Sequence, residues 1–354
     1  MKTESLIIQA DDLILVTGAA GFIGTRVVQS LLDRGFRNVR CFVRPSGNRG
    51  PLDAIRNRYQ DTACVEVIKG NLLSREDCLK AISGVAVVYH LAAGRGEKLV
   101  ADAFMNSVVT TRNLLEACHR QQGVRRFVSV SSFSVYSNCG KAVGRLLDES
   151  CPVETQPELR GDAYTFAKVK QDEIVIELAN KWNIPYVIVR PGVVYGPGNE
   201  AILGRVGVGT FGVFLHLGGA NPIPLTYVDN CAEAIVLAGL KPGVDGEVFN
   251  VVDDDLPSSR RFLRLYKRNV KRFASVYVPH AISYALCYLW EKYSAWSQGQ
   301  LPPVYGRRTW HAYWKKTFYT NQKLKSRLGW SPRIQPVEAF ARYFESCRRK
   351  ELHA

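Results

Sequence analysis

Short unbroken hydrophobic runs alternate along this chain with longer stretches in which hydrophobic residues recur at helical intervals. An unbroken run suits a strand buried on both faces of a parallel sheet, whereas the helical interval suits an amphipathic helix packed on that sheet. Right-handed crossovers between such strands leave few other topologies. The pattern therefore predicts an α/β fold with a doubly wound parallel sheet. The expected strands cover residues 13–16, 39–43, 65–68, 85–91, 126–131 and 186–190, and the two clearest helices cover 103–122 and 162–182.

A glycine-rich turn joins the first strand to the first helix. Thr17 and Gly18 follow the strand, and Gly21 and Gly24 complete a G-x-x-G-x-x-G spacing. A strand, a glycine turn and a helix in this order bring together an open backbone, unpaired N–H donors and the positive end of a helix dipole, which suit a pyrophosphate. We therefore predict dinucleotide binding at this turn, with a glycine turn that simply ends a strand as the alternative.

The second strand is followed by Arg44, at the place where dinucleotide-binding folds discriminate between cofactors. An acid here bonds the ribose hydroxyls and favours NAD, whereas an arginine can pair with the 2′-phosphate of NADP. We therefore predict NADP in preference to NAD. Arg40 and Arg49 could serve instead, and an arginine in a solvated loop is the remaining alternative.

Tyr164 and Lys168 stand four residues apart, so they share one face of the expected helix, one turn from each other. A tyrosine is a poor base at neutral pH, because its ordinary pKa is about 10. A nearby ammonium stabilises the phenolate, and lowering that pKa by about 3 units requires roughly 4 kcal/mol of differential interaction. A serine hydroxyl from the end of the fifth strand could then hold the substrate oxygen while the tyrosine moves its proton.

With these parts in this order, the chain resembles the extended short-chain dehydrogenase/reductase family, also described as the NAD-dependent epimerase/dehydratase superfamily, from residue 12 to about 251. The resemblance implies a Rossmann cofactor domain and a smaller C-terminal substrate-binding domain. We place the first at residues 1–194, with elements returning around 226–252, and the second at 195–354. The matching motifs are T-G-x-x-G-F-I-G at 17–24, the segment at 90–93, S-S-x-x-V-Y at 131–136, Y-x-x-x-K at 164–168 and R-P-G-x-x-Y-G-P at 190–197.

The resemblance also implies the roles of individual residues. Tyr164 is expected to be the general acid/base, Lys168 to bond the nicotinamide ribose and lower the tyrosine pKa, and Ser132 to polarise the substrate oxygen, with Ser131 and Ser134 as weaker candidates for that last role. One departure is Asn71, because the family usually has Gly-Asp-Leu where this chain has Gly-Asn-Leu. The residues predicted to contact the cofactor are Thr17, Gly18, Gly21, Phe22, Ile23, Gly24, Arg44, Asn71, Leu72, Ala92, Ala93, Tyr164, Lys168, Pro191 and Val193.

Two positions bear on the substrate. Nucleotide-sugar relatives often have asparagine where this chain has Val193, and often have Arg-Asp before the later V-D pair, where this chain has Pro-Leu-Thr before Y-V-D-N at 227–230. The motifs are similar to those of the 3β-hydroxysteroid dehydrogenase and dihydroflavonol reductase branches. We therefore predict NAD(P)-dependent hydride transfer with a secondary alcohol or ketone. The alternatives are a nucleotide-sugar epimerase or dehydratase that retains its cofactor, and a non-catalytic protein that senses NADP(H). The expected substrate contacts are Phe133, Ser134, Tyr195 and Tyr227.

The net charge of +15 belongs mainly to the C-terminal part of the chain. Residues 260–273 carry seven Lys/Arg and no acid, and residues 301–354 carry twelve Lys/Arg against three acids. No nucleic-acid motif accompanies these charges, so we expect no nucleic-acid partner. Residues 262–273 and 281–296 read as a basic amphipathic helix followed by an aromatic-rich one. Both could pack on the substrate domain as core, or could rest on a membrane surface beside a lipid-like substrate.

The remaining composition concerns location and partners. Nine cysteines without C-x-x-C pairs and a start with no signal-peptide pattern predict a cytoplasmic protein with reduced thiols, with peripheral membrane contact left open. His90 has no partner at metal-ligand spacing, so we predict a packed histidine and no metal site. By resemblance, a homodimer would form through the helices that follow the fourth and fifth strands.

Overall fold

The computed structural model describes residues 6–94, 96, 99–139, 142–199, 204–298, 300–301 and 304–352. At its centre is a seven-stranded sheet, and every printed pairing within it is parallel. Its strands, in spatial order, are β12 (Val248–Val251), β7 (Tyr186–Pro191), β5 (Arg126–Val130), β4 (Val85–His90), β1 (Leu13–Thr17), β2 (Asn38–Val43) and β3 (Cys64–Lys69). The chain order along the sheet reverses between β1 and β4, which makes their carboxyl ends the expected ligand edge of such a fold.

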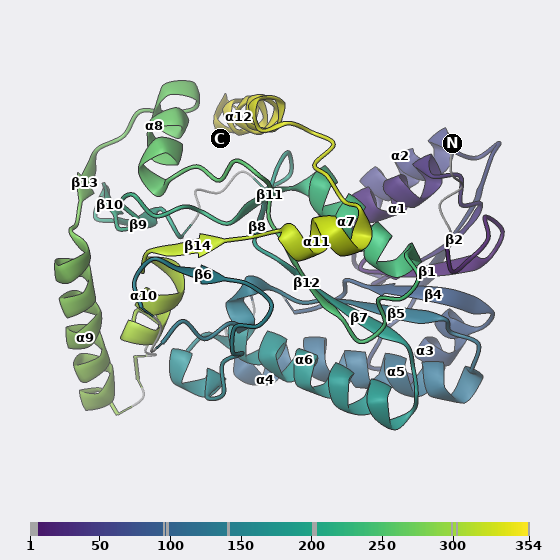
Figure 1. The fold of residues 1–354 in the computed structure, drawn as a ribbon. Coiled ribbons are helices and arrows are strands. Elements are labelled where there is room, and N and C mark those ends of the chain that lie inside the picture. The colour runs from purple at the N-terminus through teal and green to yellow at the C-terminus, as the bar shows by residue number, and fades with distance from the viewer. Residues whose placement is uncertain are drawn as a thin grey trace.

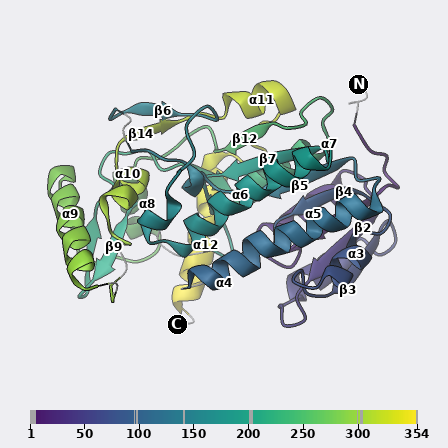
Figure 2. The ribbon, with the colours of Figure 1, turned by 90° about the horizontal axis from the view of Figure 1, so that it is seen from below.

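Helices cover both faces of this sheet (Figure 1). One face packs against α1 (Gly24–Asp33), α2 (Gly50–Arg58), α7 (Val228–Leu240) and α11 (Gln322–Leu328). The other packs against α3 (Arg75–Ile82), α5 (Thr110–Gln121) and α6 (Ala163–Lys181). Figure 2 shows α5 and α6 running side by side beneath the strands. The strands are almost fully buried because they are covered twice, and the prediction of a doubly wound parallel sheet is confirmed.

The long helix predicted over 103–122 is helical throughout but not regular. It consists of α4 (Val100–Phe104), a π-helical turn (Met105–Val109) and α5. Such turns insert one residue into an α-helix and are frequent at functional sites. Here the Ser107 hydroxyl, in the middle of the turn, accepts a hydrogen bond from the Gly94 backbone N–H at 2.9 Å. The irregular turn therefore fixes the loop that leaves β4.

The chain returns to the central sheet late. β11 (Leu225–Tyr227), α7 and β12 follow one another, and β12 adds to the sheet beside β7, with Val248 opposite Ile188. The elements expected to return around 226–252 are thus identified, whereas the exact domain boundary at residue 194 stays a prediction. The tail contributes too, because Leu324, Leu328 and Trp330 are buried in the core above the sheet.

A smaller C-terminal part lies beside the sheet. Its short strands are β8 (Val193–Tyr195) paired with β11, β6 (Arg145–Leu147) paired with β14 (Thr317–Tyr319), and β9 (Gly207–Thr210), β10 (Val213–His216) and β13 (Ser275–Tyr277) in one sheet. Its helices are α8 (Ser259–Asn269), α9 (His280–Trp296), α10 (Arg307–Tyr313) and α12 (Pro336–Leu352). The apolar face of α8 is core, because Phe262 and Tyr266 pack against Phe340 and Phe344 of α12.

Candidate active site

The glycine turn after β1 leaves no room for side chains. Gly18 has a φ of +68°, and a Cβ there would lie 3.0 Å from the Ala92 backbone nitrogen. A Cβ on Gly24 would overlap the Gly18 carbonyl oxygen, and the Gly21 N–H closes the turn on that same oxygen at 2.9 Å. The open backbone and the start of α1 therefore form a cradle that fits a pyrophosphate, which is the test that a dinucleotide site must pass.

Other predicted cofactor residues surround this cradle at the carboxyl ends of the strands. Ala92 and Ala93 follow β4 and are partly exposed, and the Ala92 N–H lies 3.3 Å from the Thr17 hydroxyl. Pro191 is the last residue of β7, and Val193 begins β8 after Gly192, whose Cβ would overlap the Pro224 carbonyl. Small residues thus line the end of the sheet where a flat cofactor would lie. Ile23 and Phe22 occupy the start of α1, where the Phe22 ring is 3.3 Å from a Cβ on Gly198.

Arg44 directly follows β2, is exposed, and donates to the Asn106 side-chain oxygen at 3.4 Å. Arg40 is engaged elsewhere, because its guanidinium donates to Glu66 at 2.7 Å and to two backbone carbonyls. Arg40 is therefore unsuited to a 2′-phosphate. Asn71 follows β3, and its side-chain oxygen accepts from the Leu73 N–H at 3.0 Å. That oxygen is occupied within its own turn, while the adjacent Leu72 side chain is buried.

Tyr164 and Lys168 lie on the first turns of α6, as the spacing predicts. Asp162 caps this helix, accepting from the Tyr164 N–H at 3.1 Å and from the Thr165 hydroxyl at 2.5 Å. Lys168 is buried and donates from Nζ to the Val130 carbonyl, the last residue of β5, at 2.8 Å. This bond joins α6 to the strand whose continuation carries Ser132. The structure therefore joins Lys168 to the strand that leads to Ser132, and Tyr164 stands one helical turn before Lys168 on α6.

Ser132 is the partly exposed member of its serine cluster, whereas Ser131 and Ser134 are buried. Its hydroxyl oxygen accepts from the Ser134 N–H at 3.1 Å and so caps the short 3₁₀ turn Phe133–Val135. A hydroxyl whose oxygen accepts in this way can still donate its own proton. Ser132 is thus held in place by its own chain and can hydrogen-bond a substrate oxygen.

Buried polar side chains connect the glycine turn to Lys168. Thr17 Oγ1 lies 2.8 Å from His90 Nδ1, and His90 Nε2 lies 2.8 Å from Thr111 Oγ1. Gln171 Nε2 donates to Thr111 Oγ1, and Lys168 Nζ donates to Gln171 Oε1, each at 2.8 Å. We call this set the Thr17–Lys168 chain. His90 is thus a packed histidine whose two ring nitrogens both form hydrogen bonds. The Thr17–Lys168 chain runs beneath β4, between α5 and α6.

Burial shifts the protonation of the two bases in this chain. It lowers the pKa of His90 to about 3, with the charge of Lys168 as a smaller cause. It also lowers the pKa of Lys168 to about 8, against the opposing effect of the Asp172 carboxylate. His90 is therefore neutral at physiological pH, while Lys168 keeps most of its charge in that range.

A buried ion pair lies one turn beyond Lys168. Arg190 of β7 donates to Asp172 from Nε at 3.1 Å and from a terminal nitrogen at 3.0 Å. Burial raises the pKa of Asp172, and the Arg190 guanidinium opposes that rise. Arg190 also lies over the Tyr136 ring, 4.8 Å from its centroid, and the Tyr136 hydroxyl donates to Asn250 of β12. The pair therefore joins α6, the S-S-x-x-V-Y segment and two strands.

The four predicted substrate contacts are all buried in the structure. Phe133 packs against Tyr136 and Tyr319, and Ser134 is buried beside it. Tyr195 and Tyr227 contact each other edge to face within the aromatic core built with α12. These rings are part of the packed core in the structure. Their substrate role stays a prediction.

Thr111, Gln171 and Asp172 were missed by the sequence reasoning although they surround the reacting lysine. Gln171 stands three residues after Lys168, a spacing that places both on one helical face. Thr111 is a buried polar residue on the helix predicted over 103–122. In the sequence, the signal that could have identified these residues is therefore a polar side chain on a helical face that packs into the protein.

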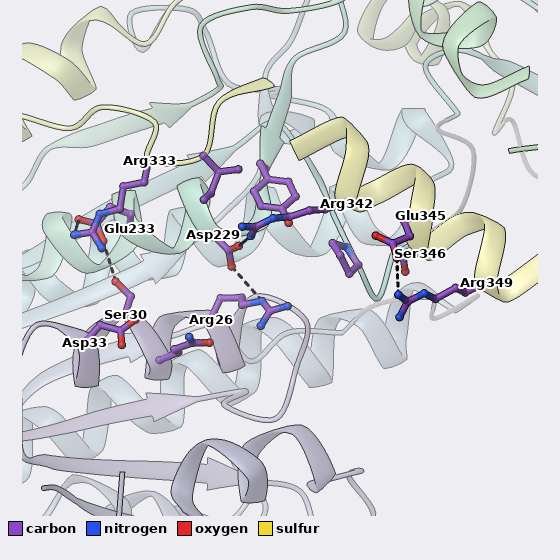
Figure 3. A pocket seen from close by; sticks show the side chains of 14 residues that line it. Arg26, Ser30, Asp33, Asp229, Glu233, Arg333, Arg342, Glu345, Ser346 and Arg349 are labelled. Carbon is purple, nitrogen blue, oxygen red and sulfur yellow. Dashed lines mark hydrogen bonds and ion pairs between the residues drawn. The ribbon is translucent and has the colours of Figure 1, made fainter. Parts of the chain in front are cut away.

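A cavity of about 460 Å³ lies between α1, α7 and α12, lined by charged residues (Figure 3). Arg26 pairs with Asp229 at 3.2 Å, Arg333 pairs with Glu233 at 2.8 Å, and the Ser30 hydroxyl donates to Glu233 at 2.9 Å. Of the predicted site residues, only Tyr227 lines it. Its opposite charges pair across the wall, so the cavity connects the C-terminal helix to the cofactor domain and is separate from Tyr164 and Lys168.

The doubly wound sheet with a glycine cradle at the end of β1 defines the class of NAD(P)-dependent Rossmann proteins. The chain belongs to the NAD dependent epimerase/dehydratase family, whose model matches residues 14–251. The resemblance to extended short-chain dehydrogenases/reductases is thereby confirmed.

Two curated relatives and one solved structure illustrate the range of this family. The chain is 29% identical to a 2-alkyl-3-oxoalkanoate reductase of Stenotrophomonas maltophilia, over 65% of this chain and 66% of that protein. It is 30% identical to a 3-beta-hydroxysteroid dehydrogenase of Mycolicibacterium neoaurum, over 68% of this chain and 67% of that one. The crystal structure of a UDP-glucuronic acid 4-epimerase from Bacillus cereus in complex with NAD covers 96% of this chain and 99% of its own, with a TM-score of 0.70 and 22% identity.

Proposed function

We propose that this protein transfers a hydride between a nicotinamide cofactor and a secondary alcohol or ketone. The observation that carries the proposal is Lys168: a buried cation one turn from Tyr164 on α6, bonded to the strand that continues to Ser132. A buried ammonium at this place stabilises a phenolate, which is the form of Tyr164 that can accept a proton. The same arrangement has no evident use in a protein that only binds a dinucleotide.

Each side chain has a distinct task in the proposed reaction. The cofactor, when bound, supplies a hydride acceptor or donor at C4 of its nicotinamide ring. Tyr164 accepts the hydroxyl proton of an alcohol, or donates one to a carbonyl oxygen. Ser132 donates a hydrogen bond to that oxygen and fixes its position. Lys168 holds the ribose and keeps the tyrosine pKa low through its charge.

The substrate class we favour is an apolar ketone or alcohol. Val193 and Pro224-Leu225-Thr226 offer no amide or ion pair to a sugar-nucleotide pyrophosphate, and two relatives are named for a ketoacid reduction and a steroid oxidation. The alternative is nucleotide-sugar epimerisation with a retained cofactor, which the family description and the epimerase fold neighbour support. The two differ in how tightly the cofactor stays bound between turnovers.

The direct test is an assay of the purified protein with NAD(H) and NADP(H) against hydroxysteroids, alkyl ketones and UDP-sugars. We expect absorbance changes at the nicotinamide with apolar ketones or alcohols, and free exchange of cofactor. Cofactor that co-purifies and survives gel filtration, with interconversion of UDP-sugars, would favour the epimerase instead. Cofactor binding with no turnover of either class would leave the sensing function.

We further propose NADP as the preferred cofactor, because Arg44 follows β2 as an exposed guanidinium whose contact with the Asn106 side chain is long, at 3.4 Å. Arg44→Asp should weaken NADP(H) binding about tenfold to a hundredfold, the range expected for lost charge-assisted hydrogen bonds. NAD(H) binding should stay unchanged or improve. Isothermal titration of both cofactors measures this, with Arg56→Asp, the same change at an exposed place on α2, as the matched control. Equal losses for both cofactors would contradict the preference.

Peripheral membrane contact is proposed for α9, at the edge of the molecule in Figure 1. Among the described residues, every helix is too short or too polar to cross a bilayer. Large side chains spaced four and three residues apart are nevertheless exposed along one face of α9, and Trp296 is 76% exposed. That face consists of Ile282, Leu286, Leu289, Tyr293 and Trp296. With the basic residues of 260–273 nearby in the chain, it suits an anionic lipid surface.

Leu289→Asp should reduce co-sedimentation with anionic vesicles about tenfold, because it removes an apolar anchor worth roughly 1.5–3 kcal/mol and adds a repelled charge. Val337→Asp is the matched control, since Val337 is also an exposed apolar residue but stands on α12. Absence of vesicle binding by the unaltered protein at low salt would end the proposal. The cytoplasmic location stays a prediction, and so does a homodimer formed through α4, α5 and α6.

A further inference from the structure

We infer that Gln171 is a positioning residue for Lys168, and that the Thr17–Lys168 chain is a fixed hydrogen-bonded support rather than a path for protons. The inference rests on the proposed hydride transfer only for its effect on rate. The hydrogen-bond directions around His90, which are the structural part of the inference, can be measured even in a protein that turns over no substrate. The Thr111 hydroxyl sets the direction of every hydrogen bond in the Thr17–Lys168 chain.

Thr111 has a single hydroxyl proton. Its Oγ1 donates to the Ser107 carbonyl, 2.5 Å away, and a backbone carbonyl can only accept. Oγ1 must therefore accept from both of its other neighbours, the His90 ring nitrogen and the Gln171 amide. A hydroxyl that accepts from two sides and donates to a carbonyl cannot pass a proton from one side to the other.

The direction at Thr111 fixes the tautomer of His90. Nε2 must carry the ring proton, because Thr111 Oγ1 accepts from it. The ring is neutral, so Nδ1 is bare and accepts from the Thr17 hydroxyl at 2.8 Å. Thr17 Oγ1 is then free to accept the Ala92 N–H, as its 3.3 Å separation allows. His90 thereby holds the end of the glycine cradle without contributing charge.

The direction at Thr111 also fixes the Gln171 amide. Nε2 donates to Thr111, so Oε1 faces Lys168 and accepts from Nζ. An ammonium has three donors, and the described residues take two of them, the Val130 carbonyl and Gln171 Oε1. One N–H is left for a ribose hydroxyl. Gln171 thus orients Lys168 while its neutral amide leaves the positive charge available to Tyr164.

The charge balance around Lys168 makes a carboxylate at position 171 a sharp test. Among the described residues, the titratable groups around the ammonium are neutral His90 from β4 and Asp172 of α6, which is bonded to Arg190 of β7, while Tyr164 stands one helical turn away. A second carboxylate in contact with Nζ would offset the charge that stabilises the Tyr164 phenolate. The pKa of that phenol would then rise.

Gln171→Glu should move the acid limb of the pH profile for alcohol oxidation upward by about one pH unit. Cofactor affinity should change by less than about threefold, because the ribose-facing N–H remains. Gln171→Leu should lower kcat without moving the limb upward. Asn180→Asp, the same amide-to-acid change at an exposed place on α6, should leave the profile unchanged. If the acid limb of Gln171→Glu coincided with that of the unaltered enzyme, the positioning role of Gln171 would be overturned.

The hydrogen-bond directions in the Thr17–Lys168 chain are tested separately by ¹⁵N NMR of the histidine rings in the unaltered protein. The His90 resonances are identified by their loss in His90→Asn. We expect a protonated Nε2, a bare Nδ1 and no titration between pH 5 and 8. A proton on Nδ1, or a ring that titrates in that range, would overturn the bond directions. If no substrate is turned over at all, the hydride transfer fails while this measurement still decides the structure of the chain.

Discussion

Tyr164→Phe is expected to lower kcat by about 10²- to 10⁴-fold, the usual contribution of a positioned general acid or base. The substitution keeps the ring and the helix start that Asp162 caps through the backbone, so only the phenolic oxygen is lost. NADP(H) affinity should stay within a few-fold, because Lys168 and the glycine cradle are untouched. Steady-state kinetics with any accepted alcohol, together with cofactor titration, measures both quantities.

The control is Tyr305→Phe, which removes a hydroxyl from a tyrosine that is 42% exposed and packed against Trp290. It should leave turnover unchanged. If Tyr164→Phe retained more than about a tenth of the activity, the phenol would not be the proton carrier, given the size of that contribution in other enzymes. If the unaltered protein bound NADP(H) but turned over no substrate, that result would favour the NADP(H)-sensing function.

The parts of the site that the sequence predicts are those whose chemistry is local. A strand, a glycine turn and a helix are consecutive, so the cradle follows from pattern alone, and Tyr164 and Lys168 share a helix at a spacing that fixes their face. Ser132 is also predictable, because it follows β5 and parallel strands have their carboxyl ends at the same edge of the sheet. The six predicted strands of the central sheet are found with bounds that differ by at most one residue at either end, and β12 is the seventh strand.

The parts that the sequence does not predict depend on which helices cross. Thr111 meets Gln171 only because α5 and α6 lie side by side under β4, and nothing near either residue in the chain indicates the other. The Tyr195 ring packs against Phe340 and Tyr343, which stand about 145 residues later, and nothing near Tyr195 in the chain indicates these partners. Likewise, both α8 and α9 carry aromatic side chains, but those of α8 are buried against α12 whereas one face of α9 stays exposed.

Asp172→Ala should destabilise the fold by about 3–5 kcal/mol, because it leaves a buried guanidinium without its counter-ion. Arg190 is 4% exposed at the side chain and Asp172 is 3% exposed, so water cannot replace the lost partner. The control is Glu173→Ala on the next position of α6, whose pair with Lys170 is solvent-exposed and worth at most about 1 kcal/mol. The shift of the thermal or urea midpoint of each variant measures the difference.

The cost in Asp172→Ala comes from an unpaired charge rather than from a lost attraction, and a double variant separates the two. Replacing both partners, Asp172→Leu with Arg190→Met, removes the attraction but leaves no charge behind, so most of the stability should return. A double variant as unstable as Asp172→Ala would mean that the contact of Arg190 with the Tyr136 ring is the dominant interaction. Asp172→Ala no worse than Glu173→Ala would show that the pair is hydrated in solution. In either case Lys168 offers an independent check, because losing the Asp172 carboxylate removes a charge that raises the pKa of Lys168.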